Sequence, residues 1–242
     1  MKRLLENRIH WHWGRIVSLG VVIAALILLI ACWPSRLSLP PLPSSIESME
    51  GYGSLRITGS QGTSKIRFSF LFFLPHQGRI ESFNFLGRSI YYILIDREKS
   101  FFVLPSKKVY WQGNVEEIIS KTLGFSLDQY EMISILSGEW NGKEISLEVR
   151  GDPEKWSFKR DEGGRIVRGQ RGDLSFEIEE FFKDSRFARL LLFHHPWIEG
   201  RLKILQIDFN QPKKPAAFSR RFLEEYELKT WAEIEKLLGN EN

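Results

Sequence analysis

The only cysteine of the 242-residue chain, Cys32, directly follows an apolar segment near the N-terminus. A thiolate is a strong nucleophile, so a lone cysteine placed here is suited to covalent modification. The apolar segment runs from Ile16 to Ala31 and contains nothing more polar than Ser18. Four basic residues precede it: Lys2, Arg3, Arg8 and Arg15. A basic region, a short apolar region and a small residue before the cut are typical of a secretory signal.

The sequence Leu29-Ile30-Ala31-Cys32 resembles the lipobox of bacterial lipoproteins. The resemblance implies that residues 1–31 are a signal peptide and that Cys32 becomes the acylated first residue of the mature protein. Lipid would then tie the protein to the outer membrane, facing the periplasm, with the inner membrane as the alternative. Trp33 is not the aspartate associated with inner-membrane retention, which favours the outer membrane.

An uncleaved transmembrane helix is the other interpretation of this segment. At about 1.5 Å per residue the apolar run covers roughly 24 Å of a hydrocarbon core of about 30 Å, so the span would have to tilt or the bilayer to thin. The basic residues before it would keep the N-terminus in the cytoplasm. A short run that ends in a lone cysteine favours the lipobox.

Other residues that could support chemistry form no convincing site. His194 and His195 are neighbours on a predicted strand, so their side chains point to opposite faces. They cannot bind one metal ion, with His76 or Asp208 as a further ligand, unless the strand kinks. Neighbouring glutamate pairs have no fixed acid–base geometry, and no nucleophile–base arrangement is present. We therefore predict a protein that is not an enzyme and that uses no metal or cofactor.

Charge and composition indicate one exported domain. The formal net charge of +4 nearly disappears with the signal segment, because 30 basic and 29 acidic residues remain. Nucleic-acid binding therefore has no support. If Cys32 is acylated, no thiol is left for a disulfide, so burial of apolar groups, among them 18 Phe, must stabilise the fold. We expect the proline-rich residues 32–45 to be a tether and residues 46–242 to form a single domain.

Alternation of apolar and polar residues predicts that most of this domain is strand. In Ser64–Leu74 four apolar residues share one face, and polar residues alternate with them. The four are Ile66, Phe68, Phe70 and Phe72. Turn residues separate the other candidate strands, which are Tyr52–Thr58, Arg79–Phe85, Arg88–Asp96, Phe101–Leu104, Lys107–Trp111, Glu144–Arg150, Trp156–Arg160, Arg165–Gln170, Leu174–Phe182, Phe187–His194 and Leu202–Phe209. So many short strands at hairpin spacing predict an antiparallel meander that closes toward a barrel.

Three amphipathic helices are also predicted: Val115–Leu123, Leu127–Leu136 and Lys229–Leu238. Asn114 with Glu117 three residues later is typical of a capping box, and Ser126 with Gln129 is a similar start for the second helix. Isolated helices this short are marginal in water, so they must lie against an apolar surface. The expected fold class is mainly β with helices (α+β): a curved antiparallel sheet in an incomplete barrel, with short helices as a lid over an apolar cavity.

Two segments resemble LolB, the family of outer-membrane lipoprotein receptors. Asn84-Phe85-Leu86-Gly87 and the strand after it are similar to that family's Asn-Pro-Leu-Gly turn, with Phe85 in place of the proline. The segment from Tyr110 to Gly138 is similar to its helical pair. The motifs shared there are Glu116-Glu117-Ile118, Leu123-Gly124 and Leu136-Ser137-Gly138. The resemblance covers about Tyr52 to Asn141 and implies an open barrel that holds acyl chains inside.

The same resemblance implies which residues carry the function. Leu86, with Phe85 and Gly87, would form a protruding loop that inserts cargo into the membrane. From spacing alone, Phe85 and Leu86 can also be core residues at a strand end, with Gly87 as a turn. The concave face is expected to include seven apolar residues: Ile66, Phe68, Phe70, Phe72, Ile118, Ile119 and Ile133.

Three functions stay open at this point. The first is a receptor that accepts lipoproteins from a periplasmic LolA-like carrier and places them in the outer membrane. The second is a lipoprotein of the same fold that binds or transports free lipid or glycolipid. The third is a structural scaffold. A cavity with a protruding Leu86 favours the first, a cavity without such a tip the second, and a filled interior the third.

Overall fold

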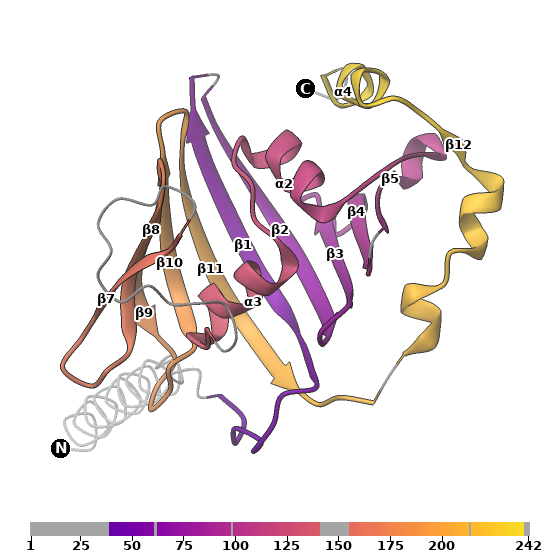
Figure 1. Cartoon of the computed structure of the whole chain (residues 1–242). Coiled ribbons are helices and arrows are strands. Elements are labelled where there is room, and N and C mark those ends of the chain that lie inside the picture. The colour runs from indigo at the N-terminus through magenta and orange to yellow at the C-terminus, as the bar shows by residue number, and fades with distance from the viewer. Residues whose placement is uncertain (1–38, 61, 98, 141–154, 213, 240–242) are drawn as a thin grey trace, which may run out of the picture. The chain divides into compact units, whose positions relative to one another are not determined.

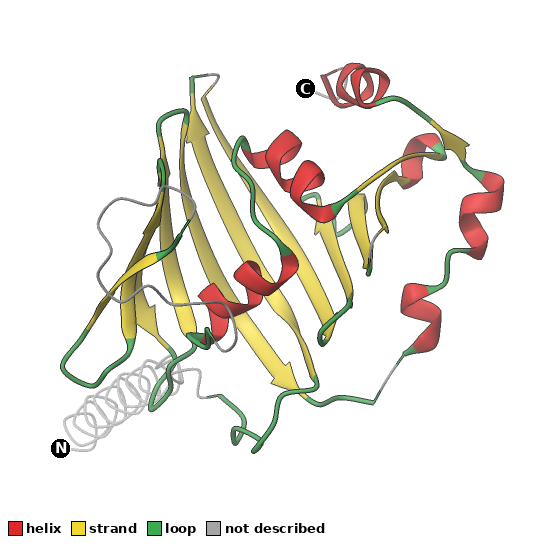
Figure 2. Cartoon of the chain, in the orientation of Figure 1, coloured by secondary structure: helices red, strands yellow, loops and turns green. Residues whose placement is uncertain are grey.

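All twelve described strands belong to one sheet, in the order β12-β6-β5-β4-β3-β2-β1-β11-β10-β9-β8-β7. The computed structural model describes residues 39–60, 62–97, 99–140, 155–212 and 214–239. In chain order the strands are β1 (Ser48–Gly59), β2 (Gly62–Phe73), β3 (Gln77–Phe83), β4 (Ser89–Asp96), β5 (Lys99–Leu104), β6 (Val109–Gly113), β7 (Ser157–Arg160), β8 (Ile166–Arg171), β9 (Leu174–Phe181), β10 (Ala188–His195), β11 (Ile198–Phe209) and β12 (Glu227–Leu228). Within the described residues β12 and β7 are unpaired edges, so the sheet is open (Figure 1, Figure 2).

Two antiparallel meanders make up this sheet. Strands β1 to β6 form the first and β7 to β11 the second, and they join because β1 pairs with β2 on one side and with β11 on the other. Only the short β12 runs parallel to its neighbour, β6. The predicted antiparallel sheet of an incomplete barrel is thereby confirmed. The single meander expected from the sequence is corrected to two, because α2 and α3 follow β6 and the second meander begins at β7, at the far edge of the sheet.

The α-helices are α2 (Val115–Leu123), α3 (Gln129–Ser137) and α4 (Trp231–Gly239), and the short 3-10 helices are η1 (Pro105–Lys107), η2 (Pro215–Phe218) and η3 (Arg221–Glu225). The predicted capping box of α2 is present, since Asn114 Oδ1 accepts from the Glu117 N–H at 2.7 Å. The predicted start of α3 is wrong. Its N-cap is Asp128, which accepts from the Glu131 N–H at 2.7 Å, rather than Ser126. Asp128 is the cap because Glu131, three residues later, completes a capping box with it.

Helices α2 and α3 lie over the same face of the sheet (Figure 1), which we call the inner face. Two core clusters hold them there, one with Ile118 and the other with Ile119. Strands β4 and β5 are apolar on both faces, because Phe222 of η3 and Tyr226 directly after it cover their outer face. Double coverage explains why the β4 sequence is an almost continuous apolar run rather than an alternating one.

Three neighbouring hairpins turn at the same end of the sheet. They are β3–β4, β1–β2 and β10–β11. Gly59 pairs with both Gly62 and Ile198, so the β1–β2 and β10–β11 turns lie side by side, and the antiparallel order of the strands places the β3–β4 turn at the same end. We call this end the hairpin rim. At the opposite end the inner face is filled by packed side chains, where the Phe187 and Phe209 ring centroids are 4.9 Å apart.

Some expectations concern residues outside the described ones. These are the signal segment 1–31, Cys32, the tether up to residue 38 and the candidate strand Glu144–Arg150. The described residues belong to one compact unit, which begins at Leu37. Within them, no helix has the length and apolar character that crossing a bilayer requires.

Candidate functional site

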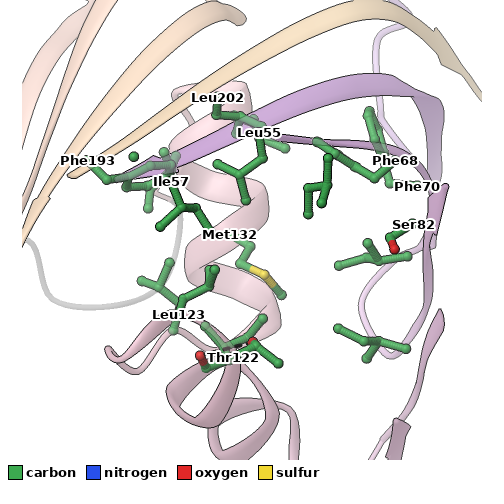
Figure 3. Close-up of a pocket in the computed structure, with 18 of the residues that line it drawn as sticks. Leu55, Ile57, Phe68, Phe70, Ser82, Thr122, Leu123, Met132, Phe193 and Leu202 are labelled. Atoms are coloured by element: carbon green, nitrogen blue, oxygen red, sulfur yellow. Dashed lines mark hydrogen bonds between the residues drawn. The ribbon is translucent and has the colours of Figure 1, made fainter. Parts of the chain in front are cut away.

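An apolar cavity of about 150 Å³ lies between the inner face of the sheet and helices α2 and α3 (Figure 3). Its strand wall comes from both meanders and consists of Leu55, Ile57, Ile66, Phe68, Phe70, Phe72, Ile80, Ser82, Tyr91, Ile93, Phe193, Ile198, Gly200, Leu202 and Ile204. Its helix wall consists of Ile119, Thr122, Leu123, Phe125, Leu127, Met132, Ile135 and Leu136. None of these described wall residues has a charged side chain. An apolar space of this size is suited to hydrocarbon groups.

Two glycines of β1 leave room for the phenylalanine rings of the neighbouring strand β2. Gly53 lies directly opposite Phe68 in the sheet, and a Cβ atom on Gly53 would come within 2.5 Å of Phe68 Cζ. Gly51 lies opposite Phe70, and a Cβ atom there would come within 2.7 Å of Phe70 Cζ and closer still to the backbone carbonyl of Gln206. The rings therefore lie flat over the glycine backbone instead of standing up from the sheet. Without these glycines the rings would occupy the cavity.

Five of the seven residues that the sequence analysis assigns to the concave face line this cavity: Ile66, Phe68, Phe70, Phe72 and Ile119. The other two lie elsewhere. Ile118 is fully buried in the core cluster that includes Phe102 and Ile234, and the half-buried Ile133 packs against that same cluster. Successive helix residues point about 100° apart, and here Ile118 packs into one core cluster while Ile119 packs into the other and lines the cavity.

The few polar groups of the wall are hydroxyls. Thr122 Oγ1 donates to the carbonyl of Ile118 at 2.8 Å within its own helix, so it presents no free donor. Ser82 and Tyr91 lie directly opposite each other on β3 and β4. Burial raises the pKa of Tyr91, and the nearby Ser82 hydroxyl lowers it to a smaller extent. The tyrosine is therefore uncharged at neutral pH, and the cavity is suited to an uncharged, largely hydrocarbon ligand.

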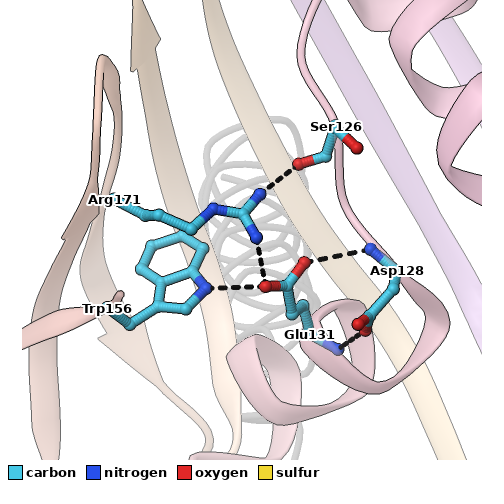
Figure 4. Close-up of polar contacts among 5 residues, drawn as sticks. All are labelled: Ser126, Asp128, Glu131, Trp156 and Arg171. Carbon is cyan, nitrogen blue, oxygen red and sulfur yellow. Dashed lines mark hydrogen bonds and ion pairs between the residues drawn. The ribbon is translucent and has the colours of Figure 1, made fainter. Parts of the chain in front are cut away.

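A buried carboxylate ties α3 to the second meander (Figure 4). Glu131, 4% exposed, accepts from the Trp156 indole N–H at 2.9 Å and from the Asp128 N–H at 3.0 Å, and it pairs with the Arg171 guanidinium. The same guanidinium donates to the Ser126 carbonyl and lies 5.1 Å from the Trp156 ring. A buried charge is costly unless it is paired and hydrogen-bonded, and here it is both. We call these contacts the Glu131 latch.

The loop between β3 and β4 is rigidly built around Asn84. Its Oδ1 accepts from the N–H groups of Leu86 and Arg88, each at 3.0 Å, and its own carbonyl accepts from Gly87 N–H at 3.0 Å. Gly87 adopts φ +75°, a conformation that favours glycine. This turn directs Phe85 and Leu86 outward, where their exposed fractions are 88% and 63%. The two side chains are therefore tip residues rather than core residues of a strand end.

The remaining candidate residues form no site in the structure. His194 is exposed, and the half-buried His195 lies against the Phe125 ring, 6.0 Å between centroids. Across the described ranges, no three His, Cys, Asp or Glu residues come together in a way that could hold a metal ion.

Sequence reasoning missed the Glu131 latch and the two glycines beneath the phenylalanine rings, Gly51 and Gly53. The capping box pointed to Glu131 as a backbone partner, but Trp156 and Arg171 are 25 and 40 residues away along the chain. These two glycines left a visible signal, since Gly51 and Gly53 recur two residues apart within β1, where the pairing with β11 also shifts register between Tyr52 and Gly53. Glycine inside a strand often marks a place where another group approaches closely.

No protein-family model matches the sequence, and no curated protein matches it either. Solved structures do match. A DUF1329 family protein from Desulfovibrio piger is 10% identical, with a TM-score of 0.53 over 74% of this chain and 92% of that one. A LolA superfamily protein from Nitrosomonas europaea is 9% identical, with a TM-score of 0.50 over 76% of this chain and 94% of that one. Likeness at such identities concerns the fold alone, and the chain has a fold of the LolA/LolB type.

Proposed function

We propose that this protein is a membrane-anchored lipoprotein that binds acyl chains in the cavity and delivers them to a bilayer. The observation that carries the proposal is the pairing of an apolar cavity with a tip that exposes Phe85 and Leu86. The cavity supports lipid binding, and the exposed tip favours membrane delivery over simple lipid storage. A scaffold would need no cavity.

In this proposal the cargo is a lipoprotein received from a periplasmic LolA-like carrier, and the destination is the outer membrane. Acyl chains lose about 0.8 kcal/mol per methylene when they leave apolar surroundings, so crossing the periplasm requires a cover. Because the cavity must also release the acyl chains, its affinity for them needs only to be comparable to that of the bilayer. No covalent chemistry is involved. Anchoring through an acylated Cys32 would keep the protein at the membrane.

The helices act as the lid in this mechanism. A cavity of about 150 Å³ is the size of one known to hold a benzene molecule, whereas an acyl chain has a dozen or more carbons. Entry of a whole chain therefore requires α2 and α3 to move away from the sheet. Residues Gly124 and Gly138, which end these helices with φ of +77° and +70°, lie at the segment boundaries where such movement would bend the chain.

Binding of a pyrene-labelled triacylated lipopeptide to the full chain tests the proposal. Ile57→Arg places a charge in the cavity wall, and Thr58→Arg places the same charge on the exposed outer face of the same strand. We expect Ile57→Arg to lose at least tenfold in affinity and Thr58→Arg to bind as the unmodified protein does. Equal binding by both variants would contradict the cavity as the acyl site.

Delivery is measured separately, as transfer of the labelled lipopeptide from the protein to acceptor vesicles. Binding without transfer would favour the second candidate, a lipoprotein that holds free lipid or glycolipid in the same cavity. Absence of any binding would leave only a structural role.

A further inference from the structure

The hairpin rim carries a second exposed apolar tip besides the β3–β4 loop. Among the described residues the three most exposed large apolar side chains are Phe85, Trp197 and Leu86, at 88%, 73% and 63%. Trp197 lies in the β10–β11 turn, on the other side of the β1–β2 hairpin. Large apolar side chains that gather at one end of a molecule need a reason, and contact with another apolar phase is the usual one.

The two tips stand on either side of the cavity. Next to Trp197, Ile198 belongs to the cavity wall, and Ile57 lies in the wall close to the same turn. Near the other tip, Ser82 is part of the wall and precedes the β3–β4 loop by two residues. At about 4.8 Å per strand, the tips are roughly 19 Å apart across the sheet. The β1–β2 turn between them carries no charged residue.

The charges around these tips fit a phosphate-bearing surface. Arg88 is exposed beside Leu86, and Lys107 and Lys108 are exposed in the β5–β6 connection at the same end of the sheet. Exposed acidic residues at this end include Glu199, Asp173 and Glu227, of which Glu227 pairs with Lys229. Arg88 is the charged residue of the β3–β4 tip itself. Tryptophan prefers the headgroup level of a bilayer, and lysine and arginine are attracted to anionic lipid.

We infer that the Trp197 hairpin is a second membrane contact, so that the rim sits on an anionic bilayer at two points with the cavity between them. The inference rests on the proposed membrane delivery and extends it from one loop to the whole rim. Two contacts restrict the orientation of the cavity relative to the bilayer to rotation about the line that joins them, a restriction that a single loop does not impose.

The test uses the full chain, labelled with fluorotryptophan, in nanodiscs of phosphatidylethanolamine and phosphatidylglycerol. A nitroxide near the headgroup end of the lipid chains broadens the fluorine NMR signals of nearby tryptophans. The Trp197 signal is assigned by its loss in Trp197→Phe. We expect it to broaden several-fold more than the signal of the buried Trp156. A Trp197 signal as sharp as that of Trp156 would overturn the inference, whatever the lipopeptide assays give.

A functional comparison completes the test. Trp197→Ser is expected to slow lipopeptide transfer to vesicles several-fold, whereas Tyr52→Ser should leave it unchanged. Tyr52 is a matched control because it is 54% exposed but lies within β1, away from the rim. Equal transfer by the two variants would count against the second contact. If Trp197 broadens but the chain binds no lipopeptide, the membrane contact stands and the proposed function fails.

Discussion

Gly53 of β1 lies directly beneath the Phe68 ring of β2, so close that a methyl group at this glycine would meet the ring at 2.5 Å. Replacing Gly53 by alanine should therefore lift the ring into the cavity. We expect acyl-probe affinity to fall by about tenfold and unfolding stability by about 1–3 kcal/mol, as overpacking does. Lipopeptide binding and urea unfolding measure the two effects.

Gly163→Ala is the control for this substitution. A methyl group there would meet Asp161 Oδ1 at 3.4 Å, an ordinary contact, in an exposed turn between β7 and β8. Binding and stability should stay as in the unmodified protein. Undiminished affinity in Gly53→Ala would show that the space above the ring is not where the acyl chain lies.

Leu86→Glu tests the tip. Because Leu86 is exposed, its replacement should change stability by no more than about 0.5 kcal/mol. Lipopeptide binding should persist while transfer to vesicles stops, since a carboxylate resists entering the boundary between headgroups and acyl chains. The matched variant is Leu205→Glu, at an exposed leucine of β11, which should transfer normally. Normal transfer by Leu86→Glu would refute the role of the tip.

Asn84→Ala tests whether a rigid loop is needed. The change removes two hydrogen bonds, to the amides of Leu86 and Arg88, and should cost about 1–2 kcal/mol. Amide exchange at these two residues should accelerate, and transfer should slow while binding is kept. Asn84→Asp retains the acceptor oxygen and should restore slow exchange. If Asn84→Ala leaves amide exchange unaltered, the side chain does not hold the loop.

The Glu131 latch predicts a large coupling energy. Glu131→Ala leaves the Arg171 guanidinium and the Trp156 N–H without their partner, so we expect a loss of about 3 kcal/mol in unfolding free energy. Trp156→Phe removes one hydrogen bond and should cost about 1 kcal/mol. Urea unfolding of the single and double variants gives the coupling. Strictly additive losses would mean that the two side chains do not act together.

Cys32→Ser tests anchoring. If the thiol of Cys32 is acylated before cleavage, the variant should accumulate as an uncut precursor that incorporates no labelled palmitate. Immunoblotting of membrane fractions and fatty-acid labelling provide the two measurements. Normal cleavage and membrane retention of the serine variant would point to an ordinary signal peptide or a helical anchor.

Local patterns predicted most of the elements. Alternation in Ser64–Leu74 identified β2, and the capping pair Asn114 and Glu117 located α2 to the residue. These features depend on neighbours in the chain, so they are readable without a structure. The predicted start of α3 is wrong because Ser126 and Asp128 are both acceptable caps. The choice between them depends on Glu131, whose carboxylate also accepts a hydrogen bond from Trp156, outside the helix.

The sequence by itself determined the periodicity of the strands, the apolar face of β2 and the existence of a turn at Gly87. It could not determine which strands meet, because pairing of β1 with β11 joins residues about 150 positions apart. Only the tertiary structure decided that Ile119 faces the cavity and Ile118 the core, that glycines lie beneath the phenylalanine rings, and that Trp197 shares an end of the sheet with Leu86. Each of these depends on contacts between distant segments, which periodicity does not record.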